Sequence, residues 1–341
     1  MVVPLPWDAT SYYRGFGVIP DLRENMGGDL YAEHYQGQRY TWAQLHSFDI
    51  LFLQRPGNPE NLKLIKYCKD LGIKVWIDHD DNLFELPPYN RVSDEYTPEV
   101  KRTMWEMLRL ADVVTVSTQG LRDFFATNGV VAEVVPNALN EKLTPMATEY
   151  NKAGAITNYV WRGSDTHEAD TYFFGEEIYT AINSTEKRLW HFVGYNPWKI
   201  TINVEQRLVN YIKPEDIFIY FGKLLALKGQ VMHVPLVNDR LNDCKSNIAW
   251  IEATAAGMVT IAPDWPEWRK PGVTLYNDIL DYGFKLIAEI ENPEHKWKES
   301  RDYILENLTL KKVNERRAAI VRRLTDKPKT YGMNLPETMI E

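Results

Sequence analysis

Residues 245–263 read KSNIAWIEATAAGMVTIAP, a pattern that predicts an amphipathic helix, a stop at Gly257 and a short buried strand. The alanines around Glu252 would let this helix pack closely on a sheet. A glutamate is rarely buried without a partner, so Glu252 either lies on a solvated face or is buried for a function. The rest of the chain is needed to separate these two interpretations.

The chain has 341 residues, which predicts two domains rather than one. Its net charge of −8 argues against broad binding of nucleic-acid phosphates, but it is compatible with a local basic face. The two cysteines, Cys68 and Cys244, have neither CxxC nor zinc-ligand spacing and favour a reducing compartment. Neither a signal peptide nor a membrane-spanning apolar run is recognisable, so we expect a cytoplasmic protein without a transmembrane segment.

Strand and helix patterns alternate along both halves, which predicts parallel sheets with right-handed crossovers. Strands are expected at 30–35, 49–56, 74–78, 112–117, 130–135, 158–161, 189–193, 217–221, 232–236 and 259–262. Helices are expected at 59–70, where Asn58 would cap, and at 97–110, 120–128, 168–182, 204–211, 247–256, 280–291 and 310–324. We predict a first domain over 1–140, a linker over 141–155, a second domain over 156–325 and a tail over 326–341.

Several short segments, in their order along the chain, resemble GT-B glycosyltransferases of the family 4 type. Four of these segments lie in the second half or just before it. They are VPNALN at 135–140, NYVWRGS at 158–164, IFIYFG at 217–222, and the helix of Glu252 with the strand after it. SYYR at 11–14, QR at 54–55 and DHDDNLF at 78–84 resemble a bacterial and phage-encoded subgroup.

This resemblance implies an α/β fold of the GT-B class, in which two doubly wound Rossmann-like domains face one another across a cleft. The first domain would form the acceptor side, and the second would bind the nucleotide sugar. The implied reaction moves a sugar from a UDP- or GDP-sugar to a hydroxyl, with retention of configuration and no obligatory metal. A phage-encoded protein of this kind would act in the host cytoplasm.

The resemblance also implies how the donor is held. Glu252 would hold the ribose, and Gly163 and Gly222 would form glycine turns beside the nucleotide. The family pattern has two glutamates with seven residues between them; Glu252 is the second, and the position of the first is Cys244. A thiol does not accept two sugar hydroxyls as a carboxylate does. Either Asp243 replaces the missing glutamate, or the sugar is held differently.

A departing diphosphate needs fixed positive charge or a helix N-terminus beside it. Arg162 ends a predicted strand, and Lys245 precedes a helix whose first amides, at Ser246 and Asn247, are suited to phosphate oxygens. His167 is a third candidate for the pyrophosphate. The alternative for the two cations is a solvated surface charge, and for His167 a local hydrogen-bonding role.

An acidic loop follows the strand at 74–78, at the edge where open α/β sheets bind ligands. We predict a catalytic role on the acceptor side, in which Asp78, Asp80 or Asp81 orients or deprotonates the acceptor hydroxyl and His79 is the rival base. Such spacing also suits Mg²⁺ or Mn²⁺. We predict no metal site, because the loop lies away from the donor half. The alternative is a loop that caps the chain from Asn82 onward.

Four residues of the first half are further candidates for the acceptor side of the cleft: Tyr12, Tyr13, Arg14 and Arg55. An ordinary packed loop explains the first three equally well. The acceptor itself stays open between a glycan, a lipid-linked sugar and a hydroxymethylated base in DNA. DNA would need a basic face, for which the last helix offers Lys311, Lys312, Arg316, Arg317, Arg322 and Arg323, although a solvated helix face is the favoured interpretation.

Two other functions compete with the transferase. One is a non-catalytic carbohydrate-binding or scaffold protein on the same fold, which the cysteine at position 244 keeps open. The other is a glycoside hydrolase that uses paired carboxylates. The hydrolase would explain the aromatic residues and the acidic loop, but not the combination of Arg162, Lys245 and Glu252.

Overall fold

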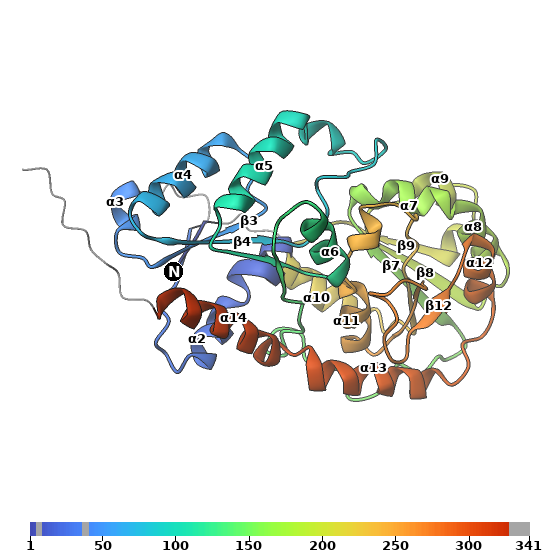
Figure 1. Cartoon of the computed structure of the whole chain (residues 1–341). Helices are drawn as coiled ribbons and strands as arrows, with labels where there is room; N and C mark the ends of the chain where they lie inside the picture. Colours follow the sequence, from blue (N-terminus) through green and yellow to red (C-terminus); the bar gives the residue numbers. More distant parts are fainter. Residues whose placement is uncertain (5–8, 36–40, 327–341) are drawn as a thin grey trace, which may run out of the picture.

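A computed structural model describes residues 1–4, 9–35 and 41–326 and shows two α/β units side by side (Figure 1). The first unit is built on a six-stranded sheet with the order β2-β1-β3-β4-β5-β6. All of its strand pairs are parallel, and Trp76 of β4 lies level with Phe52 of β3 and Val113 of β5. The strands are β1 Val2–Pro4, β2 Glu33–Tyr35, β3 Ile50–Gln54, β4 Lys74–His79, β5 Val113–Val116 and β6 Glu133–Val134.

The second unit is also built on a six-stranded parallel sheet, with the order β12-β11-β10-β7-β8-β9. Its strands are β7 Thr157–Gly163, β8 Arg188–Gly194, β9 Val209–Ile212, β10 Val231–His233, β11 Val259–Pro263 and β12 Thr274–Tyr276. Two parallel sheets with crossover helices confirm the predicted α/β class. Both sheets reverse their strand order near the centre, which places ligand sites at the carboxyl ends of the central strands.

The crossover helices of the first unit begin where the sequence places a cap. The Asn58 side chain accepts from the amide of Asn61, as predicted, and Thr97 and Thr118 cap the next two long helices in the same way. The helical segments are α1 Ala9–Ser11, the π-helix η1 Tyr12–Phe16, α2 Ile19–Asn25, α3 Trp42–Leu45, α4 Pro59–Asp70, the 3₁₀ turn η2 Ser93–Glu95, α5 Pro98–Leu110 and α6 Gln119–Thr127.

The helices of the second unit differ from the sequence prediction in several places. They are η3 Asp165–His167, α7 Glu168–Phe173, α8 Gly175–Asn183, α9 Trp198–Thr201, η4 Gln206–Leu208, α10 Ile217–Ala226, η5 Asn242–Cys244, α11 Ile248–Ala255, α12 Ile279–Ile287, α13 Pro293–Asn307 and α14 Leu310–Thr325. The helix predicted over 168–182 is broken into α7 and α8. The helix predicted over 280–291 ends at Ile287, and the 15-residue α13 that follows was not predicted.

The strand predicted at 217–221 is wrong, because these residues begin helix α10. The Asp216 side chain accepts from the amide of Phe218 and starts the helix. Ile217, Phe221 and Leu224 then face inward at helical spacing. The helix predicted at 204–211 is also wrong, because it is the turn η4 followed by β9, which pairs with β8. Short apolar runs do not distinguish a strand from a buried helix.

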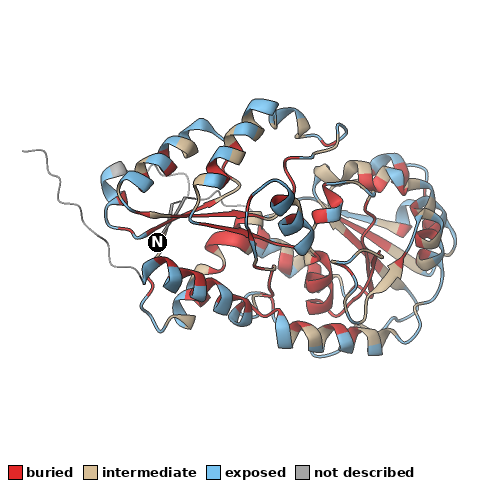
Figure 2. Cartoon of the chain, in the orientation of Figure 1, coloured by how far each residue is buried: buried red, intermediate tan, exposed pale blue. Residues whose placement is uncertain are grey.

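Helix α11 is buried on every side rather than amphipathic. All residues from Ala249 to Ala255 are buried, so the helix lies inside the protein and not on its surface (Figure 2). Helix α13 covers it from outside, where the Trp297 indole donates to the carbonyl of Thr254 at 2.9 Å. Gly257 ends α11 at a φ of 81°, where a Cβ would lie 2.9 Å from the Asn151 side chain. The predicted glycine stop is confirmed.

The chain returns to the first unit at its end. Helix α14 lies against α2, whereas α13 runs beneath the second unit (Figure 1). The backbone of Leu139 pairs with Leu308 and Leu310 at 2.8 and 2.7 Å, and the Asn314 side chain donates to the carbonyl of Val18 at 3.0 Å. Helices α13 and α14, which the sequence analysis assigned to the second domain, therefore join the two units. They do so on the face opposite the loop after β4 (Figure 1).

Candidate functional site

A cleft of about 1140 Å³ lies between the two units. From the first unit it is lined by η1 and by the loop after β4, and from the second by the ends of β7, β8 and β10 and by α11. These are mostly carboxyl ends of parallel strands, the edge at which open α/β sheets bind ligands. The lining contains many of the residues that the sequence analysis singled out, namely Tyr13, Arg55, Asp80, Asp81, Arg162, Gly163, His167, Lys245, Ser246 and Glu252.

Glu252 forms the centre of the cleft floor. Its side chain is nearly inaccessible, at 3% relative exposure. One carboxylate oxygen, Oε2, lies 2.8 Å from Nε of Arg162 and accepts from the Tyr220 hydroxyl at 2.7 Å. The other, Oε1, accepts from the Tyr13 hydroxyl at 2.5 Å. Glu252 therefore has partners from both units, and the interpretation in which it lies on a solvated face is wrong.

The two tyrosines act as hydrogen-bond donors to this carboxylate. Burial, followed by the charge of Glu252, raises the pKa of Tyr13 and of Tyr220 well above the ordinary value. Both phenols therefore stay protonated at neutral pH. Sequence reasoning missed Tyr220, because it assigned 217–221 to a strand. Read as a helix, the segment would place Tyr220 one turn after the Asp216 cap.

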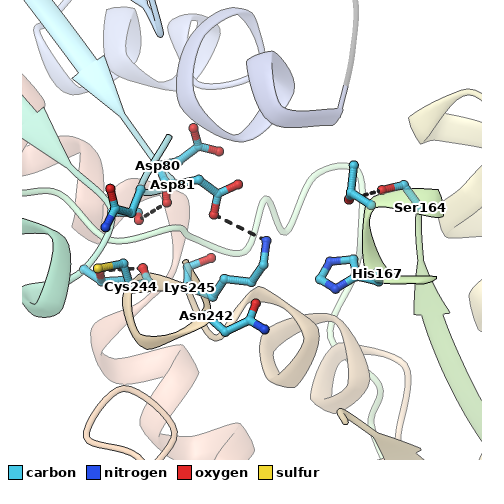
Figure 3. A network of polar contacts seen from close by, with 12 residues as sticks. Asp80, Asp81, Ser164, His167, Asn242, Cys244 and Lys245 are labelled. Atoms are coloured by element: carbon cyan, nitrogen blue, oxygen red, sulfur yellow. Dashed lines mark hydrogen bonds and ion pairs between the residues drawn. The ribbon is translucent and has the colours of Figure 1, made fainter. Parts of the chain in front are cut away.

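A second charged group faces the Glu252 floor from the first unit. Arg55 pairs with Asp80 and, at 2.8 Å, with Asp81, and Nζ of Lys245 lies 3.5 Å from Oδ1 of Asp81. Arg55 has a φ of 46°, an unusual backbone for this residue type. Figure 3 shows Lys245 extended toward Asp81, across the border between the units.

The two aspartates differ in their environment. Burial by itself would raise the pKa of Asp81, but Lys245 and Arg55 outweigh it and lower that pKa to about 2. Burial raises the pKa of Asp80 above its ordinary value, in spite of Arg55. Asp81 is therefore a fixed negative charge in the cleft, and Asp80 is the carboxyl that more readily takes a proton.

His167 borders the cleft beside Lys245 (Figure 3). Its Nδ1 lies 2.7 Å from Oδ2 of Asp170, a buried residue that the sequence analysis did not single out. The only sequence signal was the spacing of three residues that brings the two side chains to one helix face. Burial, followed by the charge of Lys245, lowers the pKa of His167. Gly163 lies beside the ring, and a Cβ there would come within 2.7 Å of Trp161 and 3.2 Å of His167.

Asp78 and Arg14 lie together in the interior of the first unit and do not line the cleft. Arg14 donates two hydrogen bonds to the Asp78 carboxylate, from Nε at 2.8 Å and from Nη2 at 2.7 Å. It also donates to the carbonyl of Val135 at 2.6 Å. Thr115 donates to the same carboxylate at 2.6 Å. The arrangement is a closed ion pair, so Asp78 has no path to a substrate.

His79 is also turned into the core. It is fully buried against the rings of Phe84 and Phe125, and neither ring nitrogen has a hydrogen-bond partner within the described part of the chain. Burial, followed by the charge of Arg55, lowers its pKa to about 3. This geometry gives His79 no route to an acceptor hydroxyl.

The remaining predicted residues lie beside the cleft rather than in its wall. Tyr12 packs against Phe16 and Phe221. Gly222 lies in α10, Asp243 is exposed, and the Asn247 side chain donates to the carbonyl of Glu267 at 3.2 Å. None of these four lines the cleft. Ser246 does line it, and accepts from the Asn137 side chain at 2.9 Å.

Cys244, which stands at the position of the expected glutamate, is part of the first unit's hydrophobic core. Its thiol is buried, and burial raises its pKa to about 12. The loop that carries it packs on α6, where the Thr118 hydroxyl donates to the carbonyl of Cys244 at 2.8 Å. Position 244 is therefore closed off from the cleft.

Two further features of the described ranges 1–4, 9–35 and 41–326 concern metal binding and the membrane. No group of three or more His, Cys, Asp or Glu side chains is arranged there to hold a metal ion. No helix in those ranges is long and apolar enough to cross a membrane.

No protein-family model and no curated protein matches the sequence. Solved structures do match the fold. HepE from Anabaena, solved with UDP and glucose, aligns over 95% of this chain and all of its own, with a TM-score of 0.67 and 10% identity. A glycosyltransferase from Rickettsia africae aligns over 95% and 97%, with a TM-score of 0.63 and 10% identity.

Sucrose-phosphate synthase from Thermosynechococcus elongatus aligns over 95% of this chain and 99% of its own, with a TM-score of 0.64 and 11% identity. These matches extend over nearly the whole length of both chains, so they show a shared fold and not a single shared domain. The chain therefore has the GT-B fold.

Proposed function

We propose that this protein is a glycosyltransferase of the family 4 type, which moves a sugar from a nucleotide-diphosphate donor to a hydroxyl with retention of configuration. The main support for this proposal is the buried carboxylate of Glu252. It lies on the floor of a cleft whose walls carry the cations Arg162 and Lys245. Residues 156–325 would bind the donor and residues 1–140 the acceptor, with 141–155 as the linker. HepE, solved with UDP and glucose, supports a UDP-sugar as the first donor to test.

In the donor half, each charged group would contact a different part of the donor or add charge beside it. Glu252 would accept hydrogen bonds from the ribose hydroxyls, since a carboxylate accepts two hydroxyls at once. Lys245, at the start of α11, would meet the diphosphate together with the first free amides of that helix. Arg162 would add charge from the end of β7, where its Nη2 is buried without a hydrogen-bond partner in the described structure. These fixed charges stabilise a leaving diphosphate without a metal.

The acceptor would enter from the side of the loop after β4. Asp80 and Asp81 present carboxylates there and are held in place by Arg55. Asp80 is the better candidate to orient an acceptor hydroxyl, because its raised pKa makes it the more basic of the two. A glycan or lipid-linked sugar suits this acidic surface better than DNA. Equilibrium binding of duplex DNA across a salt series would show a steep slope if DNA were the acceptor.

The test is release of free nucleotide when purified protein is incubated with a panel of UDP-, GDP- and dTDP-sugars. Lys245→Ala should reduce the rate by about 100-fold or more, the size of effect seen when a transition-state charge partner is removed. Lys298→Ala, a change at an exposed residue of α13, is the matched control. No release and no thermal shift with any of these donors would refute the proposal.

A non-catalytic glycan-binding protein on the same fold is the second candidate. It is favoured by Cys244, whose buried thiol leaves the position of the expected glutamate closed off from the cleft. In that case Lys245→Ala should leave glycan binding nearly unchanged, and no donor should turn over. Binding of glycans by the wild-type protein and the variant, measured beside nucleotide release, separates the two functions.

A further inference from the structure

Asp170 is a buried carboxylate that connects two loops at the edge of the cleft. Its side chain on α7 is 4% exposed. Oδ2 lies 2.7 Å from Nδ1 of His167, in the turn after β7. Oδ1 accepts from the amide of Val237 at 2.8 Å and from the side chain of Asn242 at 2.9 Å, in the loop that leads from β10 to Lys245.

This geometry decides which nitrogen of His167 carries a proton. An ionised carboxylate only accepts hydrogen bonds, so the nitrogen that faces Asp170 must be Nδ1–H. The other nitrogen, Nε2, is left for the cleft. The adjacent Cδ2 lies over Gly163, where an added Cβ would be 3.2 Å away, and Gly163 itself lines the cleft.

The charges around His167 come from four elements. Asp170 lies on α7, Lys245 before α11, Arg162 on β7 and Asp81 in the loop after β4. Burial and Lys245 lower the pKa of His167, so its ring is neutral at pH 7 in the free protein. Two negative charges of a diphosphate placed between Lys245 and Nε2 would reverse this balance and favour the imidazolium.

We propose that Asp170 is a positioning residue that holds His167 as its Nδ1–H form, so that Nε2 takes up a proton from solvent when a nucleotide diphosphate binds and then donates a hydrogen bond to a diphosphate oxygen. The step forms one Nε2–H bond with a proton from the buffer, and the proton stays on the ring. Only the identity of the ligand rests on the proposed function. The orientation of the ring is a property of the free protein.

The first experiment reads the ring of His167 directly, by ¹⁵N NMR of the free protein. His167→Gln identifies its signals among the seven histidines of the chain. The wild-type protein should show Nδ1–H. Asp170→Asn should show Nε2–H, because the carboxamide nitrogen donates to Nδ1 while its oxygen still accepts from Val237 and Asn242. An Nε2–H ring in the wild type, or an unchanged ring in the folded variant, would overturn the proposal.

The second experiment measures proton uptake on binding, by calorimetry at pH 7 in buffers of different ionisation enthalpy. UDP-glucose and GDP-mannose are the probes, since their doubly substituted diphosphates do not titrate near neutral pH. The wild type should take up close to one proton for each nucleotide bound. His167→Gln and Asp170→Asn should take up none and bind roughly tenfold more weakly.

Asp302→Asn, at an exposed carboxylate of α13, is the control and should match the wild type. Equal proton uptake in His167→Gln would overturn the role of Nε2. Binding of neither probe, together with the expected NMR result, would overturn the proposed function and the proton-uptake step. The effect of Asp170 on the ring would then stand alone.

Discussion

Each unit of the protein buries an arginine against a carboxylate, but the two pairs differ in what surrounds them. In the first unit, Arg14 grips Asp78 with two bonds, and Thr115 supplies a third. In the second, Arg162 reaches Glu252 through Nε, and its Nη2 has no hydrogen-bond partner in the described part of the chain. The first pair is closed, whereas the second forms the floor of a large cleft.

The difference shows how one pair of residue types serves two purposes. A buried pair whose hydrogen bonds are all made by the protein contributes to the integrity of the fold. The second pair has a buried donor without a hydrogen bond, and its tyrosine partners can be replaced by ligand hydroxyls. Such a pair can form new hydrogen bonds to a ligand, since a buried polar group without a hydrogen bond costs free energy. Four variants test this contrast, and the expected effects decrease from the first to the last.

Asp78→Ala should lower the free energy of unfolding by about 3–5 kcal/mol, because it leaves the charge of the buried Arg14 guanidinium without its carboxylate partner. Denaturant unfolding measures this loss. The double variant Arg14→Met with Asp78→Leu should recover most of it. Glu133→Ala, which removes one partner of an exposed pair with Arg323, should cost about 1 kcal/mol or less. Equal losses for Asp78→Ala and Glu133→Ala would contradict the closed-pair interpretation.

Glu252→Gln should weaken nucleotide binding by about 1.5–3 kcal/mol, roughly 10- to 100-fold, because an amide replaces a charged acceptor. Calorimetric titration with UDP provides the affinity. Asp243→Asn changes an exposed carboxyl of the same segment that does not line the cleft, and it should leave the affinity unchanged. A larger effect at Asp243 would instead support the idea that it replaces the missing glutamate.

The interior of the first unit should also control acid stability. The pKa of His79 is about 3 in the folded protein and about 6.5 when unfolded, so the unfolded state binds the extra proton between these values. The neutral ring makes its full contribution to the free energy of unfolding above about pH 6.5, and this contribution is lost as the pH falls toward 3. His79→Leu should reduce the slope of unfolding free energy in this window by up to about 1.4 kcal/mol per pH unit. An unchanged slope in chemical unfolding at several pH values would contradict this.

Tyr13→Phe should have the smallest effect and the opposite sign. The Tyr13 hydroxyl occupies Oε1 of Glu252, where a ribose hydroxyl would bind, and its removal frees that acceptor. UDP affinity should rise by about 1 kcal/mol or less, up to roughly fivefold. Tyr12→Phe, next in the chain but at a hydroxyl that does not donate to Glu252, should not change it. A tenfold loss in Tyr13→Phe would show that Tyr13 contacts the ligand instead.

Part of the site follows from local patterns. The strand, helix and glycine signals place the loop after β4 and the start of α11 at carboxyl ends of parallel strands, so Asp80, Asp81 and Lys245 were all found in advance. Other local patterns misled. The run at 217–221 reads equally well as a strand and as a buried helix, and the wrong choice concealed Tyr220. Asp78 lies in β4 and Asp80 just after its end, two positions apart. A two-residue alternation would place both on one face, so the pattern does not predict that only Asp80 lines the cleft.

The sequence alone determined the α/β class, the alternation of strands and helices and the glycine stop after α11, because each follows from patterns among near neighbours in the chain. It singled out Glu252 but left the burial of that side chain open. The tertiary structure decided which charges meet. Tyr13 reaches Glu252 across 239 positions, and Asp170 reaches Asn242 across 72. It also turned Cys244 into the first unit's core and paired Arg162 with Glu252. Side-chain partners at such separations are set by how two sheets pack, which no local pattern encodes.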